Sequence, residues 1–223
     1  MASANDIWQP GFETGRFFRL FISHTSRHKR EVGQLSAALS AHGIAGFVAH
    51  DSITPTEAWQ DVILRALGEC EALAAYLTED FPKSEWTDQE VGAAVIRDVV
   101  ILPLRVDINP YGFIGRIQAM PATGIDLGVL ARLIAEALGR HPRTRAAMAE
   151  AVVDRFVHSY SFDNARENFA RLQKVPAEAW TQELALSARR AVVENEQLRL
   201  AFVGDQPLSS RLYELLQSLS PPL

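Results

Sequence analysis

The sequence contains very little cysteine. Cys70 is the single thiol among 223 residues and lies in a mostly apolar run, so we expect it to be buried. A disulfide within one chain is therefore impossible, and this scarcity suits a reducing compartment. The six histidines are scattered and show no metal-ligand spacing. We therefore expect no bound metal. Cys70 also lacks a neighbouring base, so we expect no thiol catalysis.

Long apolar runs are absent as well. No stretch of about 18 apolar residues occurs, so no transmembrane helix is expected. Residues 1–15 are polar and lack the basic region and apolar core of a signal peptide. The hydrophobic content of 48% and charged content of 22% are typical of a globular protein with a sizeable core. Together these features predict a cytoplasmic protein that does not enter a membrane.

An excess of positive charge is the third missing feature. The formal net charge is −5; residues 1–141 carry 12 Lys and Arg against 17 Asp and Glu, and residues 142–223 carry 10 of each kind. Proteins that bind nucleic acids neutralise phosphates, so this balance argues against such a partner. The sequence also has no glycine-rich phosphate loop and no G-x-G-x-x-G motif.

Short apolar runs alternate with helical patterns through the first part of the chain. The runs predict strands at residues 17–22, 44–49, 72–77 and 99–102, with a weaker signal near 120–125. Pro103 is expected to end the fourth strand, where a missing donor is tolerated. Helices are expected between the strands, stopped by Gly43 and Gly68. This alternation predicts an α/β domain with an open parallel sheet of about five strands and helices on both faces.

The pattern changes after His141. Apolar residues then recur at helical spacing, and no strand signal appears. We therefore predict about four helices, including one long segment that starts at Pro176 and runs towards Phe202. The expected organisation is an N-terminal tail (1–16), the α/β domain (17–140) and an all-α C-terminal extension (142–223).

Three polar loops follow predicted strands of the α/β domain. They span residues 23–26, 51–56 and 78–84. Ligands of open parallel sheets bind beyond the carboxyl ends of the strands, so these loops are expected to frame a site. The third loop leads into a helix predicted to open at Ser84. Trp86 and Glu90 lie four residues apart, and on a helix they share one face.

Two interpretations of this helix start remain open at the level of the residues. Thr87 and Glu90 fit a T-x-x-E capping box, in which Glu90 would bond the backbone of Thr87. Alternatively, the carboxylate of Glu90 beside the aromatic ring of Trp86 holds a flat, sugar-linked ligand. Trp59 fits the apolar stripe of the preceding helix with Val62, so we expect it in the core.

Four segments resemble one family in the right order. FRLFISH at residues 18–24 resembles the first conserved box of Toll/interleukin-1 receptor (TIR) domains, and AHDSITPTEAW at 49–59 resembles the second box with its mobile loop. SEWTDQE at 84–90 resembles the segment that carries the catalytic glutamate of TIR domains that cleave NAD. NPYGFI at 109–114 resembles a stretch of bacterial members. The resemblance implies the flavodoxin-like TIR fold.

The resemblance also implies a function. Bacterial TIR proteins of this kind are NAD+ nucleosidases. They release nicotinamide and leave ADP-ribose or a cyclic isomer as part of antiphage immunity. Glu90 would then be the catalytic residue, NAD+ would be the substrate with no further cofactor, and no metal would be needed. The expected substrate-binding residues share a place on or beside the three loops: Trp86, Ser23, His24, Ser26, Asp51 and Glu57. Helix capping is an equally good interpretation of Ser26, and an exposed loop position of His24.

The resemblance leaves other functions open. Many animal TIR domains are non-catalytic adaptors that act by self-association, so a homo-oligomer through the TIR domain is expected in either case. The C-terminal helices would then offer a surface to a protein partner or trigger. A receiver-like domain shares the sheet architecture but is disfavoured, because Ser23 and His24 stand where its acidic pair would be. The sequence departs from many TIR domains at Thr56, where glycine is common, and at His50.

Overall fold

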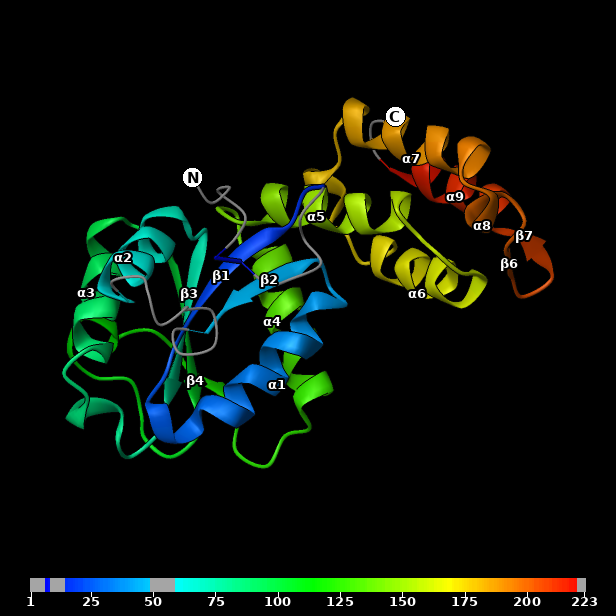
Figure 1. The fold of residues 1–223 in the computed structure, drawn as a ribbon. Coiled ribbons are helices and arrows are strands. Elements are labelled where there is room, and N and C mark those ends of the chain that lie inside the picture. The colour runs from blue at the N-terminus through cyan, green and yellow to red at the C-terminus, as the bar shows by residue number, and fades with distance from the viewer. Residues whose placement is uncertain (1–6, 9–14, 49–58, 220–223) are drawn as a thin grey trace. The chain divides into compact units, whose positions relative to one another are not determined.

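The computed structural model describes residues 7–8, 15–48 and 59–219 (Figure 1). The chain folds into two compact units. The first comprises the described residues of 1–14 and 18–135, and the second comprises 15–17 and the described residues from 136 onward. The first unit holds the sheet, and the second consists mainly of helices.

The first unit is built on one five-stranded sheet. Its strands are β1 (Phe18–Ser23), β2 (Ile44–Phe47), β3 (Ala72–Leu77), β4 (Val100–Arg105) and β5 (Met120–Pro121). The strand order is β2-β1-β3-β4-β5, and every neighbouring pair is parallel. This confirms the predicted fold class, including the short fifth strand. Parallel pairing brings all five carboxyl ends to one edge, where ligands of such sheets bind.

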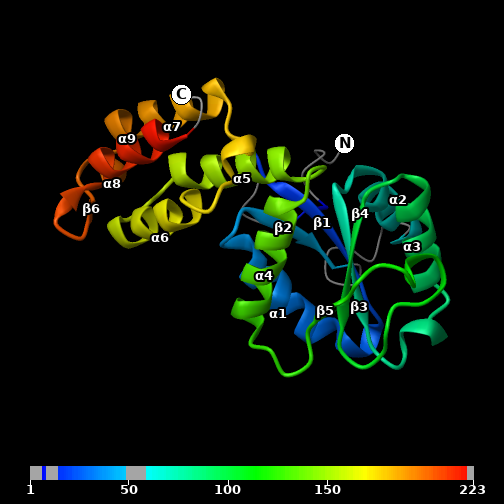
Figure 2. The same cartoon turned by 180° about the vertical axis from the view of Figure 1, so that it is seen from behind.

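Helices cover both faces of this sheet. In Figures 1 and 2, α1 (Lys29–Ser40) lies on one face with the part of α4 (Leu127–Arg140) that belongs to this unit. On the other face lie α2 (Trp59–Glu69) and α3 (Thr87–Ile96). The strands are buried on both sides, which is why they are nearly continuous apolar runs instead of alternating ones.

The fourth strand is longer than the sequence predicts. β4 continues through Pro103 to Arg105, so the expectation that Pro103 ends the strand is wrong. Pro103 pairs with Ala75 of β3, whereas β5 joins β4 only from Leu104 onward. At Pro103, β4 is therefore an edge strand on its β5 side, and a missing backbone donor is tolerated at such an edge.

The helix that carries Glu90 begins later than predicted. A short 3₁₀ turn, η2 (Phe81–Lys83), and an extended Ser84 precede it, and α3 starts at Thr87 instead of Ser84. The Thr87 hydroxyl donates to the carbonyl oxygen of Phe81 at 2.6 Å. This bond joins the first residue of the helix to the turn, so the turn and the helix start form one local structure.

Cys70 lies in the short connection between α2 and β3 and not in the strand itself. It is buried, as expected, with 2% of its surface exposed. Arg97, which follows α3, donates to the Cys70 sulfur at 3.3 Å and to its carbonyl oxygen at 3.1 Å, and also to the carbonyl oxygen of Leu67. Burial raises the pKa of the Cys70 thiol, although Arg97 opposes this effect.

The second unit packs its helices around a core of its own. The helices are α5 (Arg145–Val157), α6 (Phe162–Leu172), α7 (Gln182–Glu194), α8 (Glu196–Arg199) and α9 (Leu208–Ser218). Phe156, Phe169 and Trp180 are among the largest side chains of that core. The sequence missed a short antiparallel hairpin, β6 (Phe202–Val203) with β7 (Gln206–Pro207). Two-residue strands are too short to show a period-two pattern, which is why the sequence does not predict them.

The long helix predicted from Pro176 towards Phe202 is interrupted. α7 ends at Glu194 with Asn195 as its C-terminal cap, and the Asn195 side chain accepts from the backbone N–H of Gln197 to cap α8. Its amide also donates to the carbonyl oxygens of Val157 and Ser159. One asparagine thus ends one helix, starts the next and ties both to the end of α5, and the helical period shows none of this.

Candidate functional site

Glu90 lies at the carboxyl edge of the sheet, bonded to the end of β1. The Ser23 hydroxyl donates to Glu90 Oε2 at 2.5 Å, and both residues are buried, with Glu90 4% exposed. Ser23 is the last residue of β1, and Glu90 lies in the first turn of α3. The structure thus brings together two of the predicted site residues from segments far apart in the sequence.

Burial gives Glu90 an unusual protonation equilibrium. A carboxylate loses solvation when it is buried, and this raises the pKa of Glu90 from its ordinary 4.5 to about 7. The hydrogen bond from Ser23 stabilises the charged form and lowers the pKa, but by less than burial raises it. Carboxyl groups with such shifts are found at functional sites more often than elsewhere.

The capping-box interpretation of Glu90 is wrong. Its carboxylate accepts from Ser23, and the Thr87 hydroxyl is engaged with Phe81. Thr87 is the first residue of the helix, and Trp86 occupies the capping position without a side-chain bond to the helix. A buried carboxylate that does not cap its own helix requires another explanation.

Trp86 stands one turn before Glu90 and is half-buried. Its ring packs against Trp59, the first residue of α2, with centroids 4.4 Å apart and an interplanar angle of 66°. Trp59 is 38% exposed, so the expectation of a core residue is wrong. The apolar stripe of α2 faces the sheet through Val62 and Ile63, and Trp59 lies outside it on the Trp86 side.

The remaining predicted contacts are distributed differently. His24 is buried, and its Nδ1 lies 2.9 Å from the carbonyl oxygen of Ile22, so the alternative interpretation as an exposed loop histidine is wrong. Ser26 is exposed and opens the 3₁₀ turn η1 (Ser26–His28), where it is not the capping residue. Asp51 and Glu57 lie outside the described residues.

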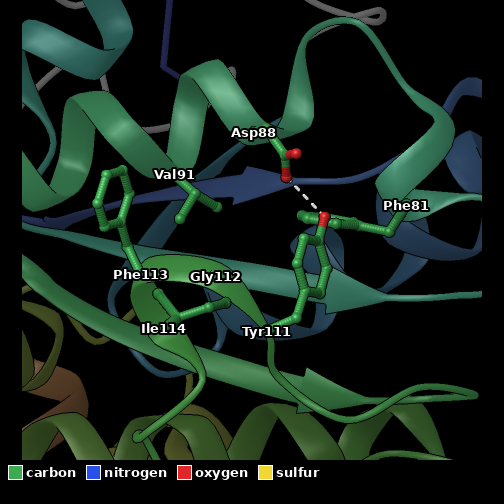
Figure 3. Close-up of a pocket in the computed structure, with 7 residues that line it drawn as sticks. All are labelled: Phe81, Asp88, Val91, Tyr111, Gly112, Phe113 and Ile114. Carbon is green, nitrogen blue, oxygen red and sulfur yellow. Dashed lines mark hydrogen bonds between the residues drawn. The ribbon is translucent and has the colours of Figure 1, made fainter.

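A separate pocket lies on another side of α3 (Figure 3). It has a volume of about 270 Å³, and most of its lining is apolar. Asp88 and Val91 line it from α3, and Tyr111 lines it from the start of the 3₁₀ turn η3 (Gly112–Ile114), with the hydroxyl donating to Asp88 Oδ1 at 2.6 Å. Glu90 does not line this pocket, since residues two apart on a helix face different ways.

The bond between Asp88 and Tyr111 is a feature that the sequence does not predict. Both residues lie in segments that the family resemblance marks, 84–90 and 109–114. No spacing within either segment shows that the two would meet, because the contact depends on how η3 lies against α3. Proximity of this kind comes from tertiary structure.

Among the described residues, no group of three or more His, Cys, Asp or Glu side chains is arranged to hold a metal ion. Within the same parts of the chain, no helix is long and apolar enough to cross a membrane.

Comparisons with known proteins indicate the family to which the sheet-containing first unit is similar. The family model described as "TIR domain" matches residues 20–134, which include all but the first two residues of the sheet and most of its helices. Among solved structures, the chain is similar to the TIR domain of the Toll-related receptor TRR-2 from Hydra magnipapillata. The identity is 20%, the coverage is 46% of this chain and 82% of that one, and the TM-score is 0.40. No curated protein matches the chain.

Proposed function

Because this chain belongs to the TIR domain family, which includes both NAD-cleaving enzymes and adaptors, we propose that its Glu90 site cleaves the bond between nicotinamide and ribose in NAD+. The observation that carries the proposal is the buried carboxylate of Glu90 at the carboxyl edge of the sheet, held by Ser23 and flanked by Trp86. A module that acts by association alone does not require such a carboxylate at this edge, and carboxyl groups with raised pKa values occur at functional sites more often than elsewhere.

The chemistry of the bond explains why one carboxylate suffices. Glycosidases that act on neutral sugars use two carboxyl groups, one of which protonates the leaving group. Nicotinamide in NAD+ is already cationic, so it departs as a neutral base and takes the bonding electron pair with it. No general acid is required, which fits a site that presents Glu90 as its buried carboxylate.

Glu90 acts through its charge. As the bond breaks, positive charge develops on the ribose, and a carboxylate in a low-dielectric site stabilises that charge strongly. Burial raises the pKa of Glu90 to about 7. A bound nicotinamide ribose brings a positive charge close to the carboxyl group and therefore favours its ionised form. The Ser23 hydrogen bond holds the carboxylate in one orientation throughout.

Trp86 supplies an aromatic surface one helical turn from Glu90. A flat cationic ring such as nicotinamide is attracted to the face of an indole, and the ring remains attractive when it leaves as a neutral base. Water can then add at the ribose carbon to give ADP-ribose and a proton. An adenine nitrogen of the same molecule can add instead to give a cyclic isomer.

The biological setting that we propose follows the resemblance to bacterial members of the family. The protein would act in the cytoplasm as part of antiphage immunity, without a cofactor. It would assemble into a homo-oligomer through its TIR domain, with the helical unit as the surface for a partner or trigger. TIR domains commonly self-associate, so assembly is expected to control the activity.

Turnover of NAD+ by the full chain tests the proposal. The wild-type protein and Glu90→Ala are compared, dilute and with a crowding agent that promotes assembly, and the products are separated by chromatography and identified by mass. We expect nicotinamide release that Glu90→Ala abolishes. The product mass then distinguishes ADP-ribose from a cyclic isomer. Equal turnover by both proteins, or none by either, would contradict the proposal and favour an adaptor that acts by self-association.

A further inference from the structure

The ring pair of Trp59 and Trp86 is the least expected contact of the α2–α3 face. Large aromatic side chains that remain 38% exposed, as Trp59 does, leave apolar surface in water. The Val62 and Ile63 side chains of the same helix are buried. Trp59 is therefore not required to complete the core, although it is placed against Trp86 with a ring separation of 4.4 Å.

The geometry of the pair favours one orientation of Trp86. Aromatic rings attract each other most in edge-to-face or offset arrangements, because the edge of one ring is positive and the face of the other is negative. The interplanar angle of 66° is of the edge-to-face kind. A half-buried indole at the capping position of a helix has several rotamers available, and contact with a second ring selects among them.

We infer that Trp59 is a positioning residue of the Glu90 site, which acts by holding the Trp86 indole in the orientation that stacks on a flat ring of the substrate. The inference rests on the proposed function for the identity of that ring, the nicotinamide of NAD+. Trp59 touches Trp86 and acts through it, whereas Trp86 and Glu90 meet the substrate. Because Trp59 is the first residue of α2, the start of α2 thereby influences how α3 presents its aromatic surface.

The effect should appear in binding and not in the chemical step. Stacking on Trp86 holds the ring in the ground state and in the transition state alike, and loss of such uniform binding raises KM without changing kcat. We expect Trp59→Leu to raise KM for NAD+ about fivefold, within the range that an aromatic pair supports. Trp59→Phe retains a ring and should remain within about twofold of the wild type.

A double-substitution cycle on the full chain separates positioning from general structure. Trp86→Leu, Trp59→Leu and the double variant are compared, with Leu64→Ala as the matched control, since Leu64 is 62% exposed on the same helix. If Trp59 acts through Trp86, Trp59→Leu adds nothing once Trp86 is replaced. Additive effects in the double variant, or a Leu64→Ala effect as large as that of Trp59→Leu, would overturn the inference.

A second measurement needs no turnover. Two indoles in contact give a paired positive and negative band in far-ultraviolet circular dichroism. We expect this couplet in the wild type and in Leu64→Ala, and its loss in both Trp59→Leu and Trp86→Leu. A couplet that survives Trp59→Leu would overturn the inference even if NAD+ is cleaved. Conversely, a chain that shows the couplet but neither binds nor cleaves NAD+ refutes the proposed function while the ring pair stands.

Discussion

Two carboxylates on one helix carry out the same hydrogen-bonding task in different surroundings. Glu90 accepts from the Ser23 hydroxyl at 2.5 Å, and Asp88 accepts from the Tyr111 hydroxyl at 2.6 Å. They are two residues apart on α3, so they face different sides of it. Glu90 is 4% exposed, whereas Asp88 is exposed.

The difference indicates that burial is the largest influence on the pKa in each pair, with the hydrogen bond opposing it at Glu90 and adding to it at Tyr111. Burial raises the pKa of Glu90 to about 7, against the effect of Ser23. On the other side of α3, burial and the neighbouring Asp88 carboxylate raise the pKa of Tyr111 well above its ordinary range. Burial thus disfavours ionisation of the Glu90 carboxyl group in one pair and of the Tyr111 phenol in the other. We therefore expect the Glu90–Ser23 pair to matter for catalysis, and the Asp88–Tyr111 pair to contribute to stability only as an ordinary hydrogen bond.

The largest contrast is expected in turnover. Glu90→Gln keeps the size of the side chain but removes the charge, so kcat for NAD+ should fall by about 100-fold or more. Asp88→Asn is the matched change two residues away and should leave kcat within about twofold. Both are measured as initial rates of nicotinamide release by the assembled full chain. Equal losses in the two variants would remove the distinction between the pairs.

The next effect concerns pH. The ratio kcat/KM follows ionisation in the free enzyme, so it should rise with pH around a midpoint of about 7, where Glu90 becomes charged. Ser23→Ala removes the hydrogen bond that lowers this pKa, and the midpoint should move upward by about one unit. The alkaline plateau should fall as well, because Glu90 also loses the hydrogen bond that orients it. A midpoint that stays in place in Ser23→Ala would show that another group controls the profile.

The free energy of unfolding of the first unit should depend on the same pKa of Glu90. It should fall as pH rises, whereas kcat/KM should rise. Below pH 4.5 the Glu90 carboxyl is protonated in both the folded and the unfolded chain, so burial costs no charge. Between 4.5 and about 7 the unfolded chain loses this proton first, and stability falls as pH rises. Above 7 the cost is complete and amounts to about 3 kcal/mol.

Glu90→Gln removes that cost. The variant should be more stable than the wild type by up to about 3 kcal/mol near pH 8, and the gain should vanish near pH 4. Denaturant unfolding at several pH values, followed by circular dichroism, measures it. A gain that is the same at every pH would show that packing, and not charge burial, is responsible.

The smallest effect is expected at the exposed pair. Tyr111→Phe removes the hydroxyl that binds Asp88 but leaves the ring on the pocket wall (Figure 3). The loss in stability should be about 0.5 to 1 kcal/mol, the range of an ordinary hydrogen bond, with no change in turnover. A much larger loss would mean that this pair holds η3 against α3 in the way that Ser23 holds Glu90.

The sequence alone predicts the architecture because the first unit follows local rules. Continuous apolar runs such as Ala72–Leu77 become fully buried parallel strands, and Gly43 follows the end of α1 with a positive φ of 75°. The expectation that Gly68 stops α2 is wrong, because the helix continues through that residue. Proximity of Ser23 to Glu90 also follows, since loops after parallel strands meet at one edge. These inferences need only periodicity and topology.

The remaining features depend on side chains that meet from separate elements. A helical stripe does not show that Trp59 turns away from the core towards Trp86, and a T-x-x-E pattern looks the same whether Glu90 caps its helix or accepts from Ser23. Asn195 breaks a helix through bonds to Val157 and Ser159, about forty residues earlier in the chain. Such choices are settled by tertiary contacts that outweigh local propensity.

The rate at which a thiol reagent modifies Cys70 can report on local opening of the protein. The Cys70 thiol is buried, its pKa is raised and its sulfur accepts from Arg97, so a thiol reagent reacts with it when the end of α2 separates from Arg97. Since the chain has no other cysteine, each molecule is modified once, at a known place. The rate of modification relative to a free thiol then measures how often this part of the first unit opens. Any ligand that binds the closed form slows that rate in proportion to its occupancy, so affinity can be read from the protein's own sulfur without an added label.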